Sequence, residues 1–297
     1  MQIQMFKIFA DLADTQSFSK AADANSITQS AVSQQIRAAE KSFGVILIER
    51  GRRDFALTSE GKAFLEASRE ILEIYGNLGG RLRKMRDVIG GELRIATVYS
   101  IGLHELPPYL KQFRRAYPEV EVKVEYRRSA QVYMAVLEGS ADIGLVAYPA
   151  KRRGLDVLTF WKDKLVLICA PTHRFAHRRK IKIQDLDGEK FISFEPDLPT
   201  RKEIDRRFKE ENIKVRHALE FDNIETVKRS VEIENGISIV PETAVQAEAR
   251  SGSLHIVEID ATDMWRPIGA LIKRRLSGSH ARQKFLHLLE KTNLGAV

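Results

Sequence analysis

One amphipathic pattern, between Ser26 and Gly44, constrains this chain more than any other segment because it predicts a helix together with both of its ends. Ser26 or Thr28 can cap the start, since a side-chain oxygen there accepts a hydrogen bond from a free N–H of the first turn. Gly44 can end the helix in a left-handed turn at no steric cost. Apolar residues recur at helical spacing and predict the buried stripe: Val32, Ile36, Ala39 and Phe43.

The opposite face of this predicted helix carries amide, hydroxyl and guanidinium groups: Gln29, Ser30, Ser33, Gln34 and Arg37. In the major groove of DNA a Gln amide can pair twice with adenine and an Arg twice with guanine. A solvated helix face would have a similar composition, because Ser and Gln are common there. The face alone therefore leaves both interpretations open.

The flanking segments favour the nucleic-acid interpretation. Ser17 to Asn25 reads as a short helix that starts at Ser19, with two alanines where a second helix must approach closely. Three arginines then surround Gly51, as a hairpin wing that contacts phosphate requires: Arg50, Arg52 and Arg53. Ser17 and Thr28 complete the candidate DNA contacts.

The ordered sequence FSKAADANSITQSAVSQQIRAAEKSFGVILIERGRRDFALTSEGKAF resembles the winged helix-turn-helix of the LysR-type transcriptional regulators over about sixty residues. The resemblance implies sequence-specific binding to double-stranded promoter DNA over residues 1–58. It also implies a dimer or a tetramer of paired dimers, contact with RNA polymerase, and control by a small-molecule effector. A regulator that needs no ligand is the nearest alternative.

Residues 59–89 are predicted to form a long linker helix, capped by Thr58 and Ser59. Apolar residues alternate at three- and four-residue steps, which is typical of a coiled-coil seam: Phe64, Ala67, Ile71, Ile74, Leu78, Leu82 and Met85. Such a helix has nothing of its own to pack against, so we expect it to pair with a second copy of the chain. A helix that lies on its own domain is the alternative.

Residues 90–297 alternate between strand and helix patterns, which predicts an α/β domain with a parallel sheet. The strands are expected at 92–98, 120–126, 141–146, 164–170, 190–194, 217–221, 236–240 and 266–274. The helices are expected at 106–118, 129–138, 200–212, 224–234, 242–250 and 279–292. The order and the phrases ADIGLV and GISIVP resemble the LysR-type effector domain, which is similar to periplasmic binding proteins. The resemblance implies half-domain I at 92–161 and 268–297, half-domain II at 162–267, and two crossover segments between them.

A ligand in such a fold binds beyond the carboxyl ends of strands, where helix N-termini favour anions. The resemblance places an effector at seven residues there: Ser100, Ile101, Ser129, Pro199, Thr200, Asn223 and Ile224. Their hydroxyl and amide groups suit a small carboxylate, sulfate or phosphate. Ser129 and Thr200 could instead only cap helices. Arg201 and Lys202 could add positive charge at the rim.

Composition adds limits rather than a location. The net charge is +8 with a pI near 9.5, which suits a polyanion partner. Residues 1–90 hold 13 Lys/Arg and 11 Asp/Glu, a net +2, and the remainder holds +6, so bulk charge does not mark the N-terminus. The amphipathic N-terminal helix is not expected to be a signal peptide, and no apolar run is long enough to span a membrane. We expect a cytoplasmic protein.

No enzyme, metal or cofactor site is expected. His173 and His177 are four residues apart and would share a helix face, yet no Cys or carboxylate ligand is near. Cys169 is the only cysteine, which excludes an intrachain disulfide, and its apolar neighbours predict a buried core residue. The rival interpretation from another class is a cytoplasmic solute-binding or enzymatic domain with a vestigial DNA-binding domain.

Overall fold

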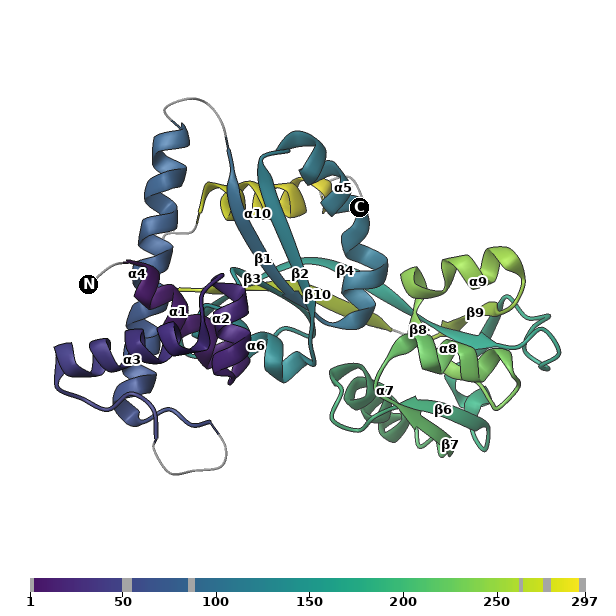
Figure 1. Ribbon diagram of the computed structural model, residues 1–297. Coiled ribbons are helices and arrows are strands. Elements are labelled where there is room, and N and C mark those ends of the chain that lie inside the picture. Colours follow the sequence, from purple (N-terminus) through teal and green to yellow (C-terminus); the bar gives the residue numbers. More distant parts are fainter. Residues whose placement is uncertain (1–2, 50–54, 85–88, 262–263, 275–278, 294–297) are drawn as a thin grey trace. The chain divides into compact units, whose positions relative to one another are not determined.

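A computed structural model of the chain describes residues 3–49, 55–84, 89–261, 264–274 and 279–293 (Figure 1). The backbone separates into two compact units. One contains residues 1–91 with 138–140 and 277–281, and the other contains the rest. We call them the N-terminal unit and the C-terminal unit.

The N-terminal unit consists of α1 (Ile3–Thr15), α2 (Phe18–Ala24), α3 (Gln29–Phe43) and α4 (Ser59–Lys84). Buried apolar side chains of the first three helices form its core, to which Leu47 also contributes. Ile48 and Leu57 form an antiparallel bridge at the base of the predicted wing. The wing arginines Arg50, Arg52 and Arg53 lie outside the described residues.

The caps of α3 are those the sequence predicts. Thr28 Oγ1 accepts a hydrogen bond from the Ala31 amide at 3.2 Å, and Gly44 has a φ of 68°. The predicted start of the second helix at Ser19 is wrong. Ser17 has the extended backbone of a capping residue and accepts from the Lys20 amide at 3.4 Å, so Ser19 already lies inside α2.

Phe43 is not buried as the stripe predicts, because it is the last residue of α3. It remains 51% exposed, and its ring centroid lies 5.4 Å from that of Phe64. Val32, Ile36 and Ala39 are buried as expected.

The first half of α4 packs on its own unit, so the expectation that this helix has no partner within the chain is wrong there. The Phe64 ring lies 5.8 Å from Phe6 and 5.0 Å from Phe9 between centroids, and Ile71 packs against the same core. Farther along, Ile74 is 67% exposed, and Leu78 is also exposed. The side chains of Leu82 and Met85 lie outside the described residues.

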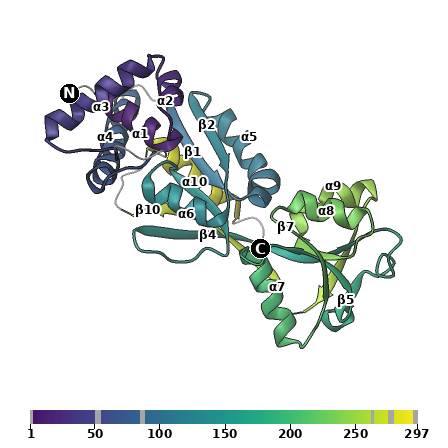
Figure 2. The ribbon, with the colours of Figure 1, turned by 60° about the horizontal axis from the view of Figure 1, so that its bottom comes forward.

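The C-terminal unit is built on a mixed sheet with the strand order β2-β1-β3-β10-β4-β9-β5, to which β8 adds by pairing with β4; β6 and β7 form a second, small sheet (Figures 1 and 2). The strands are β1 (Gly91–Thr97), β2 (Val120–Tyr126), β3 (Ile143–Ala147), β4 (Leu155–Cys169), β5 (Lys180–Lys182), β6 (Lys190–Phe194), β7 (Arg216–Phe221), β8 (Ser238–Pro241), β9 (His255–Asp260) and β10 (Trp265–Lys273). The helices and helical turns are η1 (Ile101–Glu105), α5 (Leu106–Ala116), α6 (Ser129–Glu138), η2 (Ile183–Leu186), α7 (Pro199–Glu210), α8 (Ile224–Glu232), η3 (Glu242–Val245), α9 (Gln246–Ser251) and α10 (His280–Asn293).

The sheet is not wholly parallel, contrary to the expectation from alternating strands and helices. β1 pairs with β3 in parallel, but β10 runs antiparallel to both β3 and β4 because the chain returns to the first strands from the far end of the unit. β5 and β9 lack an expected counterpart, and the helix expected at 242–250 divides into the turn η3 and the short α9. Residues 171–177 form turns, so His173 and His177 do not share a helix face.

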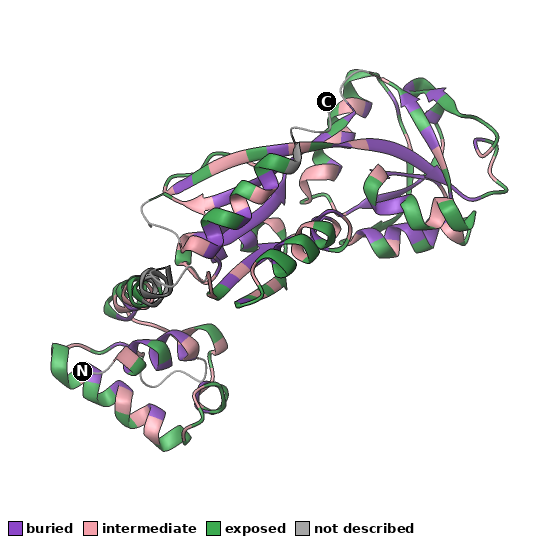
Figure 3. Ribbon diagram, turned by 90° about the horizontal axis from the view of Figure 1, so that it is seen from above, coloured by how far each residue is buried: buried purple, intermediate pink, exposed green. Residues whose placement is uncertain are grey.

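Two lobes of the C-terminal unit are joined by the long strands β4 and β10. The first lobe contains β1–β3, α5, α6 and α10, and the second contains β5–β9 and α7–α9. Residues 155–164 of β4 pair with 265–273 of β10, and residues 165–169 continue into the second lobe to pair with β8 and β9. In the C-terminal unit many strand residues are buried, whereas the helices have one buried side and one exposed side (Figure 3). Cys169, at the end of β4, is fully buried as predicted, and burial raises the pKa of its thiol to about 11.

We expect two glycines of α4 to respond oppositely to substitution by alanine. A Cβ at Gly61 would lie 2.0 Å from the Leu47 carbonyl oxygen, so Gly61→Ala should destabilise the N-terminal unit by at least ~2 kcal/mol. A Cβ at Gly76 meets nothing within 4 Å, so Gly76→Ala should stabilise the helix by roughly 0.5–1 kcal/mol. Thermal unfolding of the two variants measures the difference. Equal changes of the same sign would contradict this packing.

Candidate functional site

The polar face of α3 is exposed, because Val32 and Ile36 on its other side are buried in the core. Gln29, Ser30, Gln34 and Arg37 are exposed, and Ser33 is half-buried. This helix therefore presents two amides, two hydroxyls and one guanidinium. Such groups form hydrogen bonds with the edges of DNA bases.

Two of the predicted DNA contacts also serve the helix starts. Thr28 is exposed, and its hydroxyl lies 2.9 Å from that of Ser30 while capping α3. Ser17 is half-buried, and its hydroxyl accepts from the first turn of α2.

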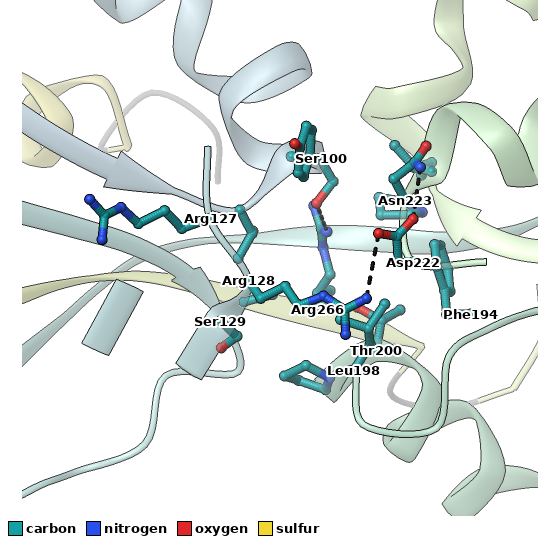
Figure 4. Close-up of a pocket in the computed structure, with 16 residues that line it drawn as sticks. Ser100, Arg127, Arg128, Ser129, Phe194, Leu198, Thr200, Asp222, Asn223 and Arg266 are labelled. Carbon is teal, nitrogen blue, oxygen red and sulfur yellow. Dashed lines mark hydrogen bonds and ion pairs between the residues drawn. The ribbon is translucent and has the colours of Figure 1, made fainter. Parts of the chain in front are cut away.

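A cavity of about 670 Å³, including space open to solvent, lies between the two lobes of the C-terminal unit (Figure 4). Six of the seven predicted effector residues line it: Ser100, Ser129, Pro199, Thr200, Asn223 and Ile224. Ile101 does not, because it is fully buried in the π-helical turn η1.

Three helices begin at this cavity. Asn223 caps α8, accepting from the Thr226 amide at 3.0 Å. Ser129 and Pro199 are the first residues of α6 and α7, and among the described residues no side chain caps the start of α7. The hydroxyls of Ser129 and Thr200 bond to no other described residue, which argues against a purely capping role and leaves both able to donate to a ligand.

An arginine crosses the cavity from the first lobe to the second. The Arg128 guanidinium lies 2.8 Å from Glu195, 3.5 Å from Asp222 and 3.6 Å from Asp197, measured from nitrogen to carboxylate oxygen. His104 Nε2 also reaches the second lobe, 2.8 Å from Glu225 Oε1. These pairs are partly exposed, so water and salt screen them. Sequence reasoning missed Arg128, although it directly precedes Ser129.

A buried charged cluster stands where the lobes meet, and the sequence did not reveal it. Arg266 of β10 is 2% exposed and lines the cavity. Its Nη2 donates to Glu105 and, at 3.2 Å, to Asp163 Oδ2 of β4, while Nη1 donates to Ser100 Oγ at 2.8 Å. Figure 4 shows the Arg266–Ser100 bond. Thr243 Oγ1 of η3 lies 2.6 Å from the same Asp163 oxygen and 3.1 Å from Glu105 Oε1.

Burial raises the pKa of Glu105 to about 8. The Arg266 charge opposes this rise in pKa, whereas the Asp163 charge adds to it. Two buried carboxylates and one guanidinium would carry a net negative charge if all were ionised, and a protonated Glu105 makes the cluster neutral.

Arg201 does not add charge at the cavity rim as expected. It is buried, and its guanidinium donates to Asp205, to Glu220 at 2.8 Å and to the Phe194 carbonyl at 2.6 Å. Lys202 is exposed and does not line the cavity.

Within the described ranges no helix combines the length and the apolar character needed to cross a membrane. Among those same residues, no three His, Cys, Asp or Glu side chains gather as a metal site would require.

Comparison with known proteins matches both units. Residues 3–62 match the family described as bacterial regulatory helix-turn-helix protein, lysR family, and residues 86–293 match the LysR substrate binding domain. The HTH-type transcriptional activator CmpR of Synechocystis is 27% identical over 287 residues, which cover 97% of this chain and 94% of that protein.

Solved structures show the same fold. CbnR complexed with its target DNA has a TM-score of 0.69 at 23% identity, with 98% of this chain and 100% of that one covered. The regulatory domain of Synechocystis CcmR in complex with 2-PG has a TM-score of 0.63 at 26% identity, with 68% of this chain and 97% of that one covered.

Glu105→Gln should change how stability depends on pH. The pKa of Glu105 is higher in the folded chain than its ordinary value near 4.3, so the folded state binds the extra proton between that value and about 8. Stability from this group is therefore present at low pH and is lost as the pH rises through the folded pKa. Glutamine does not titrate, so the variant should lose less stability between about pH 5 and about pH 9.

Urea unfolding across this pH range measures the effect, with Glu121→Gln as the control because Glu121 is exposed on β2. Parallel pH profiles for the wild type and Glu105→Gln would show that Glu105 is ionised throughout.

Proposed function

This chain belongs to the LysR family of transcriptional regulators, and from that premise we propose which of its residues read DNA and which bind the effector. The family fixes the activity: DNA-binding regulation of transcription with an effector-binding domain. The observation that carries the effector proposal is the cavity, which gathers three helix N-termini, a buried arginine and two hydroxyls that have no hydrogen-bond partner among the described residues. Free N–H groups at helix starts, together with Arg266, favour a small anion.

A small-molecule effector has support from a relative. The CcmR regulatory domain, similar to the C-terminal unit, is a complex with 2-PG. We propose that the effector of this chain lies between the lobes and contacts Ser100, Ser129, Thr200 and Asn223. A regulator that needs no ligand is the alternative, in which water would bond to the half-buried hydroxyls of Ser129 and Thr200.

DNA contact is proposed for the exposed face of α3 in the major groove, and for Arg50, Arg52 and Arg53 at phosphates. That CbnR was solved with its target DNA supports this use of the fold. Base edges would be contacted by the polar face of α3, which carries Gln29, Ser30, Ser33, Gln34 and Arg37. The DNA backbone would be contacted by Ser17 and Thr28, which lie at the starts of α2 and α3.

The proposed domains are 1–58 for DNA, 59–89 for dimerisation and 90–297 for the effector. Exposed Ile74 and Leu78 support pairing of α4 with a second copy. We further propose a dimer or tetramer that contacts RNA polymerase, has no catalytic activity and acts in the cytoplasm, where promoter DNA is found.

Gln34→Ala should weaken binding to the specific site by ~1–3 kcal/mol while binding to random DNA persists, because one bidentate base contact is lost. Fluorescence anisotropy with the chain's own promoter and with random DNA measures both affinities. Gln35→Ala is the matched control, since it removes the same amide one residue away from the reading face. An equal loss on both DNAs would refute Gln34 as a base reader.

An anionic effector should stabilise the full-length chain through Ser129 and Thr200. At a hundred times its Kd, a ligand adds ~2.7 kcal/mol, which a thermal shift detects. We expect a hit among small carboxylates, sulfate and phosphate, and expect it to disappear in the Ser129→Ala/Thr200→Ala variant but to remain in Ser251→Ala, a change in α9. A shift that survives the double variant would place the ligand elsewhere.

A further inference from the structure

The described residues use only some of the hydrogen-bond donors of Arg266. A guanidinium has five N–H donors. Three are accounted for by Glu105, Asp163 and Ser100, and Nε is buried without a hydrogen-bond partner among the described residues. One Nη1 hydrogen remains on the side of the group that reaches Ser100.

Arg266 also fixes what Ser100 can do. Because the Ser100 oxygen accepts from Arg266 at 2.8 Å, its own hydroxyl hydrogen is free to donate. Both residues line the cavity. The floor of the cavity therefore offers the Ser100 hydroxyl as a donor, and this hydroxyl is bonded to the almost completely buried guanidinium of Arg266.

The single positive charge of Arg266 already has two carboxylate partners. Glu105 and Asp163 are both buried, and both draw on the same Nη2 atom. An anion at Ser100 would be a third negative group on one guanidinium. Three negative groups around one positive charge are strongly unfavourable in a buried site unless one is neutralised.

We propose that the cavity floor is a proton-coupled anion subsite, in which an oxyanion of the effector accepts from Ser100 and Arg266 while Glu105 takes up a proton. This inference rests on the proposed effector function of the cavity and specifies the charge of the ligand and its partner groups. Ser100 and Arg266 contact the anion. Glu105 is a positioning residue that acts through Arg266.

Among the ionisable groups that surround it, Glu105 is the one that takes up the proton. The charged groups that face it are Arg266 on β10 and Asp163 on β4. The Thr243 hydroxyl on η3 lies 2.6 Å from Asp163 Oδ2 and 3.1 Å from Glu105 Oε1, so it is nearer to the Asp163 carboxylate. Burial raises the pKa of the Tyr109 and Tyr148 phenols. The Glu105 charge adds to the rise at Tyr109, and the Arg266 charge opposes it at Tyr148. Both phenols therefore keep their own protons, and neither competes with Glu105 for the proton.

The subsite also connects the lobes. Glu105 and Ser100 belong to the first lobe, Thr243 to the second, and Asp163 and Arg266 to the two crossover strands. A change in the protonation of Glu105 alters hydrogen bonds to all of these elements at once. Anion binding and lobe position thereby share one set of contacts.

Isothermal titration calorimetry of the full-length chain with sodium sulfate tests the subsite. Sulfate keeps its two charges from about pH 6 to about pH 9, so any proton exchanged belongs to the protein. Titrations in two buffers of different ionisation enthalpy, at constant ionic strength set with NaCl, give the number of protons taken up. On the alkaline side we expect uptake to approach one proton per sulfate, and the sulfate Kd to rise by up to ~tenfold per pH unit.

Three variants separate the roles. Glu105→Gln should abolish proton uptake and hold the Kd at its low-pH value throughout, because glutamine resembles the protonated acid. Ser100→Ala should raise the Kd at every pH. Glu121→Gln, on exposed β2, should behave as the wild type.

Sulfate binding with no proton uptake and no pH dependence in the wild type would overturn the coupling, and so would unchanged uptake in Glu105→Gln. No sulfate binding at any pH would overturn the subsite. A neutral ligand that still stabilises the chain through Ser129 and Thr200 would then preserve the proposed effector function and refute only the anion at Arg266.

Discussion

The C-terminal unit depends on how one buried positive charge is compensated. Arg266 lies on the crossover strand β10, and its partners come from η1, β4 and the loop after β1. Removing one partner from a buried ion pair leaves an uncompensated charge, which is strongly destabilising. The register of β4 against β10 is therefore fixed by electrostatics as well as by the ladder, with Arg266 opposite Asp163. The same residues form the floor of the cavity, so the position of the lobes and the environment of a ligand are set together.

The N-terminal unit depends on a different contact, the aromatic cluster around Phe64. This ring lies against Phe6, Phe9 and Phe43 and ties the start of α4 to the helices that carry the DNA-reading face. A helix fixed in this way at one end can still offer its exposed Ile74 and Leu78 to a second copy. The apolar residues in the first half of α4 thus pack on the core of the N-terminal unit, and those farther along are free to pack on a second copy of the chain.

Local sequence signals were sufficient for much of this arrangement. Thr28 and Gly44 define α3 because caps act within a single turn. Ser129, Thr200 and Asn223 could be located at the cavity because helix starts after strands gather at one edge of a sheet. Ser19 failed as a cap by two residues, since Ser17 offers the same hydroxyl.

Long-range pairing was beyond the sequence. Arg266 and Glu105 are separated by 161 residues, and no local pattern joins them. Arg201 was expected beside Thr200 at the rim, but neighbours on a helix point about 100° apart, so one faces the cavity and the other turns inward to Glu220. The antiparallel return of β10 was missed for a related reason, because alternating strands and helices do not specify where the last strand inserts.

Regulation by an effector requires that the cavity and the DNA-reading face are energetically coupled. Promoter affinity of the full-length chain would be measured with and without a saturating anion at constant ionic strength, and anion affinity with and without promoter DNA. Coupling through one equilibrium requires that the two ratios be equal and different from one. Ratios of one in both titrations would contradict the account, because an anion would then fill the cavity without changing how the chain binds DNA.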